Sequence, residues 1–244
     1  MTWSNLMSVE FLKLRTVRSP LALLLGAQLI VAAGVAGVAL ADEYPAGSSR
    51  ATELALQHVG LLSLLGLVLG AVTTAGEYRH RTICDTYLAV PSRARVIAAK
   101  TLLMVPGGVV LGTLGALTAL ASTALWYAAQ DVALPLDSAT ARTLAGGILW
   151  CACFTVIGAA VGAIVRNLAV AVAGALTWIA LVEGIVAGLL GDGADWLPFA
   201  CGQALVGLGP DGGPSPGAAG TVLAGWALLL CALAVSSTVG RDVP

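Results

Sequence analysis

The sequence predicts an all-α, polytopic membrane protein with six transmembrane helices. Hydrophobic residues make up 58% of its 244 residues, charged residues only 10%, and the mean hydropathy is +0.93. Such a composition is typical of membrane proteins rather than of soluble cores. A hydrocarbon core of about 30 Å requires about 20 apolar residues per helix. Six runs reach this length: 20–41, 56–76, 102–127, 142–165, 168–190 and 218–239. The loops between them are short, so we expect one transmembrane domain over residues 1–244.

The basic residues predict the orientation of these helices. In a six-span topology with a cytoplasmic N-terminus, ten of the twelve Lys and Arg residues lie on the cytoplasmic side: Lys13, Arg15, Arg18, Arg79, Arg81, Arg93, Arg95, Lys100, Arg166 and Arg241. The opposite side holds only Arg50 and Arg142. This asymmetry follows the positive-inside rule. We therefore expect an N-in/C-in protein, with residues 192–217 forming an extracellular loop.

Residues 1–19 have the pattern of an amphipathic helix. At 100° per residue, one arc of that helix holds mainly apolar side chains: Trp3, Leu6, Met7, Phe11, Leu14 and Val17. An apolar arc beside basic residues is typical of a helix that lies in the membrane interface. Glu10 interrupts the arc, where a carboxylate facing lipid would be costly. Two interpretations stay open: Glu10 faces a protein partner, or it extends to water or pairs locally with Lys13 or Arg18.

The most polar stretch, "GEYRHRTICDTYLAVPSRARVIAAK" at residues 76–100, connects the second and third apolar runs. Its first part predicts a short helix, Pro91 would end that helix, and Ser92 would cap the helix that returns to the membrane. We expect residues 77–100 to form an elbow that projects into the cytosol and docks a soluble partner. The alternative is a solvated loop that serves only to anchor the topology.

Two segments of this stretch, "GEYRHRT" and "PSRARVIAAK", resemble a signature of bacterial type-two ABC exporter permeases. In that family an E-Y-R-x-x-T pattern between spans two and three precedes a P-x-R and a Lys. The matching positions are Glu77, Tyr78, Arg79, Thr82, Pro91, Arg93 and Lys100. The sequence departs from the pattern at Arg81, where the family often has Gly. The N-terminal amphipathic helix and a hydrophobic hairpin-like segment before the last span, "ADWLPFACGQALVGLG", are also family features.

The resemblance implies a permease subunit of an ATP-driven exporter in the bacterial cytoplasmic membrane. The chain contains no G-x-x-x-x-G-K-[ST] phosphate-binding loop, so ATP and Mg would bind a separate partner. The expected partners are two copies of an ABC ATP-binding subunit, a second permease subunit that is identical or paralogous, and membrane lipid, but no nucleic acid. We expect no cofactor, catalytic residue or metal site on this chain. The residues expected to couple it to the ATPase are Glu10, Glu77, Tyr78, Arg79, Thr82, Tyr87, Pro91, Arg93 and Lys100.

Within the predicted spans, an acid and a pair of glycines carry further expectations. Glu183 lies in the fifth apolar run, where an ionisable side chain is costly and is a functional candidate by default. It would line a translocation path, or instead bond to a neighbouring helix or reach the outer interface. Gly158 and Gly162 form a G-x-x-x-G in the fourth run, which predicts close packing against another helix.

Three other classes of protein were weighed against a permease. An intramembrane enzyme would need a catalytic motif such as HExxH or paired carboxylates in one span, and neither occurs. A secondary transporter would usually be longer, with repeated halves and several intramembrane charges. A non-transport membrane scaffold is opposed only by the motif at residues 76–100. Co-purification discriminates among them, because an ABC permease brings an ATPase with it.

Overall fold

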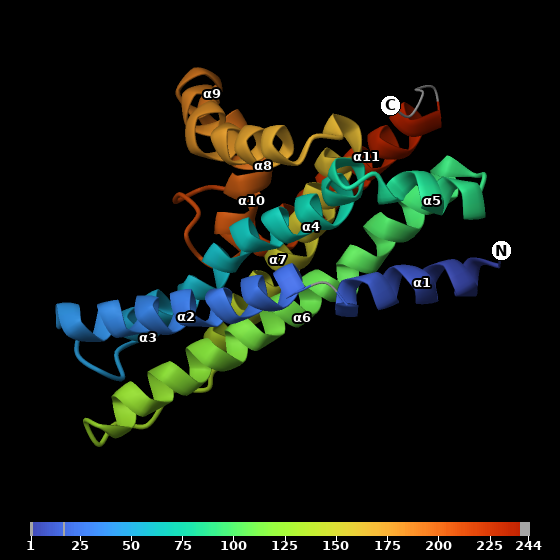
Figure 1. Cartoon of the computed structure of the whole chain (residues 1–244). Coiled ribbons are helices and arrows are strands. Elements are labelled where there is room, and N and C mark those ends of the chain that lie inside the picture. Colours follow the sequence, from blue (N-terminus) through green and yellow to red (C-terminus); the bar gives the residue numbers. More distant parts are fainter. Residues whose placement is uncertain (1, 17, 240–244) are drawn as a thin grey trace.

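The computed structural model describes residues 2–16 and 18–239, and within these residues every regular element is a helix (Figure 1). Six helical segments are long and apolar enough to cross a membrane, as the apolar runs predict. These segments are Pro20–Ala41, Ser49–Arg79, Arg93–Ala128, Ser138–Val165, Leu168–Trp196 and Pro216–Thr238. Arg241, one of the basic residues used to predict the orientation, lies outside the described residues.

Several of these segments contain more than one element. The element order is α1 (Trp3–Thr16), α2 (Arg18–Ala41), α3 (Ser49–Gln57), η1 (His58–Leu61), α4 (Leu62–Arg79), α5 (Thr82–Ala89), α6 (Arg93–Ala128), α7 (Ser138–Val165), α8 (Leu168–Thr177), η2 (Trp178–Val182), α9 (Glu183–Leu190), η3 (Gly191–Trp196), α10 (Pro198–Leu205) and α11 (Pro216–Val239). The turn η2 is a π-helix, so the fifth span combines α, π and 3₁₀ geometry.

The helices α3 and α7 begin before the predicted apolar runs, because each has a polar N-cap residue and a polar first turn. Ser48 accepts a hydrogen bond from the backbone N–H of Ala51 and caps α3, whose first residue, Ser49, lies seven residues before the predicted start of the second span. Asp137 caps α7 in the same way through the N–H of Thr140 at 2.8 Å. Such caps satisfy backbone donors that a helix end otherwise leaves unpaired. Counting apolar residues finds the membrane segment but leaves out these polar first turns.

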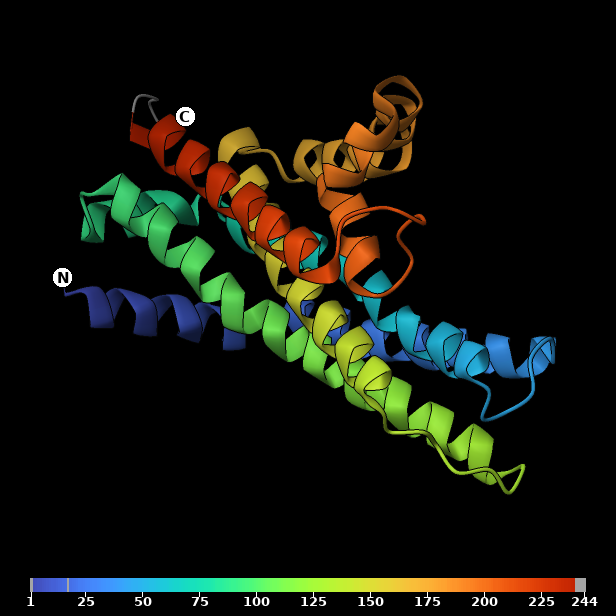
Figure 2. The ribbon, with the colours of Figure 1, turned by 180° about the vertical axis from the view of Figure 1, so that it is seen from behind.

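Helix α7 forms the centre of the bundle and packs against α4, α6 and α11 (Figures 1 and 2). Of its most apolar stretch, 72% is buried within the chain, compared with 17% for α2 and 11% for the segment of α8 and α9. The core is therefore built around α7, while α2, α8 and α9 turn most of their apolar side chains outward. Exposed apolar side chains at membrane depth fit lipid or another membrane chain.

Glycines set the close approach of α4 to α7. A Cβ atom added to Gly158 would lie 2.0 Å from the backbone oxygen of Leu67, and one added to Gly70 would lie 2.0 Å from that of Thr155. Gly162 is tight against the backbone of Ala71 as well. The close packing predicted from Gly158 and Gly162 is confirmed, and α4 is the partner. Small residues at such an interface let two backbones approach and gain dispersion contacts.

One end of the bundle carries α1, α5 and the end of α11, and the other carries the loops after α2 and α6 (Figures 1 and 2). Between α4 and α5 the chain turns at Arg81, whose φ of 59° lies in the left-handed region. Glycine is the residue that adopts this region without strain. Ser92 precedes α6 as predicted, but its side chain makes no capping hydrogen bond. We call residues 77–100, which include α5, the elbow.

Candidate functional site

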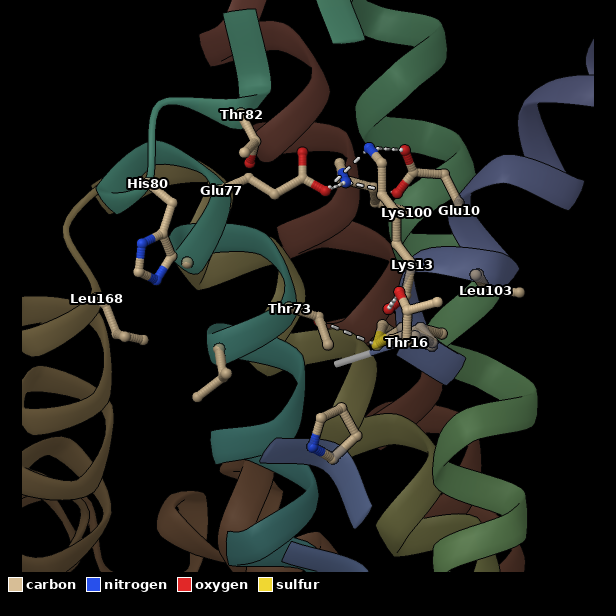
Figure 3. Close-up of a pocket in the computed structure, with 15 residues that line it drawn as sticks. Glu10, Lys13, Thr16, Thr73, Glu77, His80, Thr82, Lys100, Leu103 and Leu168 are labelled. Atoms are coloured by element: carbon tan, nitrogen blue, oxygen red, sulfur yellow. Dashed lines mark hydrogen bonds and ion pairs between the residues drawn. The ribbon is translucent and has the colours of Figure 1, made fainter. Parts of the chain in front are cut away.

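Four charged side chains meet at the end of the bundle that carries α1 and the elbow (Figure 3). Lys100 of α6 forms ion pairs with Glu10 of α1 and Glu77 of α4. Lys13 of α1 pairs with Oε1 of Glu10 at 2.8 Å and with Oε1 of Glu77 at 3.1 Å. We call these residues the Glu-Lys cluster. Their formal charges cancel, and their contacts join three helices that are far apart in sequence.

Most of the Glu-Lys cluster is withdrawn from solvent. Glu10 and Lys100 are each only 4% exposed, and the Glu77 side chain is 12% exposed. Burial lowers the pKa of Lys13, but its hydrogen bond with Glu10 and the negative charges of Glu77 and Glu10 outweigh burial and raise that pKa above its usual value. A buried ion pair adds little net stability relative to apolar packing, but removing one partner leaves a buried charge without compensation. The cluster therefore fixes how α1, α4 and α6 lie relative to one another.

The cluster explains the acid in the apolar arc of α1. Leu6 and Glu10 are one turn apart and both buried, whereas Trp3 is 44% and Phe11 50% exposed. The inward face of α1 is therefore narrower than the predicted apolar arc, and Glu10 lies within it. Val17, the last residue of that arc, lies outside the described residues.

Of the two interpretations of Glu10, the local pairing with Lys13 is present. The pair with Lys100, which neither interpretation included, is the more buried of the two. In this structure the Glu10 side chain is enclosed by its own chain. Any effect of Glu10 on partner docking would act through the Glu-Lys cluster.

The inner face of the elbow packs on apolar side chains next to the Glu-Lys cluster. Ile83 of α5 is 1% exposed and packs with Leu6 of α1 and with Val90, Val96 and Ala99. These contacts hold α5 against α1 and α6. The inner face of α5 is thus packed against the bundle.

Two tyrosines connect the elbow to the ends of α7 and α11. The hydroxyls of Tyr78 and Tyr87 are 3.1 Å apart and form a hydrogen bond. Arg93 lies over the Tyr87 ring at 5.6 Å, and Arg166, at the end of α7, lies over the Tyr78 ring at the same distance. Arg166 also donates to the carbonyl of Ser237 on α11. Burial raises the pKa of Tyr87, and its hydrogen bond with Tyr78 adds to the effect, so this contact holds a neutral hydroxyl.

The outer face of the elbow is exposed and mixes charged with apolar side chains. Arg79, Thr82 and Pro91 are exposed. Leu88, at the last turn of α5, is 83% exposed. A large apolar side chain exposed at the tip of a polar segment is a common anchor in protein interfaces. Among the predicted coupling residues, Arg79 and Pro91 are thus exposed. Glu10, Glu77 and Lys100 instead hold the elbow from inside.

A cavity of about 380 Å³ lies next to the Glu-Lys cluster, between α1, α4 and α6 (Figure 3). Lys13, Glu77, Lys100 and Thr82 line one part of it. The rest is lined mainly by apolar residues: Leu14, Pro20, Val72, Leu103, Met104 and Leu168. The cavity therefore has a charged end and an apolar end.

Glu183 lies far from the Glu-Lys cluster in the fold and caps a helix. It is buried, with 6% exposure, and both of its carboxylate oxygens accept from the backbone N–H of Phe199, at 3.2 and 3.1 Å. Phe199 is in the first turn of α10, whose own N-cap residue, Leu197, offers no side-chain acceptor. Of the predicted roles of Glu183, bonding to a neighbouring helix is the one seen here. A role in a translocation path stays a prediction.

The sequence does not assign Lys13 to the Glu-Lys cluster or Arg166 to the contacts with Tyr78 and Ser237. It predicts Lys13 only as a local partner for Glu10 and as a topology signal, and Arg166 only as a topology signal. The i,i+3 spacing of Glu10 and Lys13 was the available signal for the first. No local pattern marks Arg166, because its partners Tyr78 and Ser237 are distant in sequence.

Neither a protein-family model nor a curated protein matches this chain. The site must therefore be interpreted from its own residues. Within residues 2–16 and 18–239, no group of three or more His, Cys, Asp or Glu side chains is arranged to hold a metal ion. The site consists of the Glu-Lys cluster, which has no net charge and is largely buried, and of α5, whose outer face is exposed.

Proposed function

We propose that this chain is the membrane-spanning permease subunit of an ATP-driven exporter and that the elbow docks its ATPase. The observation that carries the proposal is the two-sided construction of α5. Its inner face is held by Ile83 and by the hydrogen bond from Lys13 to Thr86. Leu88 is exposed on its outer side, as is Arg79 at the end of α4. A helix whose outer side chains bind a soluble partner and whose inner side chains pack on the membrane helices can transmit a displacement from that partner to the spans.

In this proposal both termini and the elbow lie in the cytoplasm, in agreement with the distribution of basic residues. The expected ATPase has two copies, each with its own ATP and Mg. The expected second permease subunit, identical or paralogous, would cover part of the outward-facing apolar surface of α2, α8 and α9. The membrane is the bacterial cytoplasmic membrane, and the elbow resemblance is the basis for the exporter class.

The path from the elbow into the membrane runs through the helices that anchor it. Lys100 is in the second turn of α6, a helix that continues to Ala128, and Glu77 is near the end of α4. Arg166 connects Tyr78 to α7 and to α11. Displacement of α5 by an ATPase would therefore act on four spans at once.

Photo-crosslinking in native membranes tests the docking. A photoreactive amino acid at Leu88 is expected to crosslink to a chain that contains a phosphate-binding loop, identified by mass spectrometry. The same amino acid at Leu125, which is 73% exposed on α6 away from the elbow, is the control. A Leu88 adduct with no nucleotide-binding chain, or the same adducts from both positions, would contradict the proposal.

Charge reversal supplies an independent test. Charge-assisted hydrogen bonds contribute about 1.5–3 kcal/mol each, so losing one at a docking surface weakens binding by roughly ten- to a hundredfold. Arg79→Glu should reduce co-purification of the ATPase by about this factor while the protein still inserts in the membrane. Arg142→Glu, the same reversal on an exposed residue at the other end of the bundle, should leave co-purification unchanged. Normal co-purification with Arg79→Glu would demote Arg79 to a topology signal.

A further inference from the structure

One carboxylate oxygen of Glu77, a residue that lines the cavity, has no hydrogen-bond donor among the described residues. Oε1 of Glu77 accepts from both Lys13 and Lys100, whereas Oε2 of Glu77 is buried and accepts from no described residue. Both carboxylate oxygens of Glu10 are used, one by each lysine. A buried charged acceptor without a donor costs more free energy than an exposed one. Glu77 Oε2 therefore lacks a compensating donor among the described residues.

The lysines differ in how many of their N–H groups are occupied. An ammonium has three donors. Lys13 uses all three, on Glu10, Glu77 and the hydroxyl of Thr86 at 2.9 Å. Lys100 uses two, on Glu10 and Glu77, and among the described residues nothing accepts from its third. Next to each other, the site therefore offers one carboxylate oxygen and one ammonium N–H.

This pair complements a ligand that carries both a donor and an anionic acceptor. The Glu-Lys cluster has two positive and two negative charges, so it has no net charge to attract a simple anion or cation. A zwitterion matches it, with an ammonium for Glu77 Oε2 and an anionic oxygen for Lys100. The apolar end of the cavity, with Leu14, Val72 and Leu103 among its residues, would receive the part of the ligand next to the headgroup.

We propose that this cavity binds the headgroup of a zwitterionic phospholipid with a primary ammonium, of the ethanolamine type. The amphipathic helix α1 borders the cavity, and its exposed Trp3 and Phe11 suit the membrane interface, the depth of lipid headgroups. The lipid ammonium donates to Glu77 Oε2, and the lipid phosphate accepts from Lys100. A bound lipid stabilises the contact of α1 with α4 and α6. This proposal does not depend on ATPase docking.

Matched lipids test the headgroup requirement. The full chain is purified in detergent and titrated with dioctanoyl phosphatidylethanolamine or dioctanoyl phosphatidylcholine, and bound lipid is counted by native mass spectrometry. The two lipids have the same charges, but the quaternary ammonium of the second has no N–H to donate. Phosphatidylethanolamine should bind with one copy per chain and at least about tenfold more tightly. Equal binding of the two lipids would overturn the proposal.

A cavity-filling variant tests the location without touching the charges. Gly76 lines the cavity, and a Cβ atom added there meets nothing within 4 Å, so Gly76→Leu should fold and fill the space. It should lose phosphatidylethanolamine binding by at least about tenfold. Gly37→Leu, at a position on α2 that is also open within 4 Å, is the matched control and should bind as the wild type does. Unchanged binding in Gly76→Leu would place the lipid elsewhere and overturn the proposal.

Two further arms separate the role of Glu77 and the source of the ligand. Glu77→Gln replaces one carboxylate oxygen by an amide and should abolish the preference for ethanolamine; if this variant does not fold, Gly76→Leu decides alone. O-Phosphoethanolamine has the same headgroup without chains and should bind far more weakly than the lipid. Equal affinity for this water-soluble compound would contradict a lipid ligand.

Discussion

Lys100 and Glu10 form an ion pair between α6 and α1 across 90 residues of sequence, and each is only 4% exposed. Lys100 is also paired with Glu77, so its ammonium contacts both buried carboxylates. Lys100 therefore links α6 to both α1 and α4. Removing it should lower the stability of the protein, because Glu10 and Glu77 would lose a positive partner.

Lys100→Met should destabilise the protein by about 3–5 kcal/mol, because it leaves two buried carboxylates with only Lys13. The measurement is loss of monodisperse protein on heating in detergent. Arg95→Met, five residues earlier on α6 and exposed, is the control and should change little. The double variant Lys100→Met with Glu10→Met restores neutrality and should be more stable than Lys100→Met alone. Additive losses in the double variant would contradict a coupled cluster.

Gly158→Ala should force α4 and α7 apart. The new Cβ atom would lie 2.0 Å from the Leu67 carbonyl oxygen, and backbone cannot yield as a flexible side chain can. Overpacking of this kind costs about 1–3 kcal/mol. The yield of folded protein and its thermal midpoint should both fall. Gly174→Ala, on α8 where a Cβ meets nothing within 4 Å, should behave like the wild type, and equal losses in both variants would contradict tight α4–α7 packing.

Arg81→Gly should stabilise the turn between α4 and α5. Arg81 has a φ of 59°, a conformation that costs a residue with a Cβ atom about 1–2 kcal/mol. Glycine removes this strain, although its unfolded chain has more freedom to lose. Arg81→Gly should therefore raise the thermal midpoint. The control, Arg95→Gly, is in the helical first turn of α6 and should lower it instead. A lower midpoint for Arg81→Gly would mean that the Arg81 side chain contributes more than its backbone costs.

Glu183→Leu should destabilise α10, because Phe199 loses its only side-chain acceptor among the described residues. Loss of an N-terminal cap costs about 0.5–2 kcal/mol. Glu183→Gln keeps one acceptor oxygen and should lie between Glu183→Leu and the wild type. Thermal stability measures the cap, and transport assayed at matched amounts of folded protein measures a path role. Transport loss in Glu183→Gln at normal stability would favour the path.

Labelling of introduced cysteines tests the orientation. Glu43 and Gln130 are exposed at one end of the bundle, and His80 and Arg95 at the other. In intact cells, with Cys84 replaced by Ser, an impermeant thiol reagent should label cysteines at Glu43 and Gln130 only. Labelling of the His80 and Arg95 positions instead would reverse the orientation predicted from the basic residues.

Runs of apolar residues in the sequence predict the transmembrane spans but not the contacts between them. The six membrane-length helices follow from runs of apolar residues, because burial in hydrocarbon acts on each segment separately. Gly158 and Gly162 likewise predict tight packing, but nothing in their spacing identifies α4 as the partner. Helix ends escape prediction where a polar turn such as the one capped by Ser48 lies outside the apolar run.

The site shows the same division. The polar composition of residues 77–100 predicts an elbow, and Pro91 lies between its two helices. The pairing of Glu10 with Lys100 is not predictable from either residue, because it depends on the three-dimensional approach of α1 to α6. Glu183 is similar. The sequence shows that an ionisable side chain lies within the fifth span, where it is costly. Its hydrogen bond from Phe199, 16 residues later, depends on how α10 folds back.

The separation of the Glu-Lys cluster along the chain sets an order for its assembly during synthesis. Glu10 leaves the ribosome 90 residues before Lys100, which at about 5–20 residues per second is roughly 5–20 s. During that interval α1 has no buried partner for its acid except Lys13. Newly made chains stopped before α6 should therefore hold α1 loosely at the membrane surface and be cleaved there by protease, whereas chains that have released Lys100 should be protected.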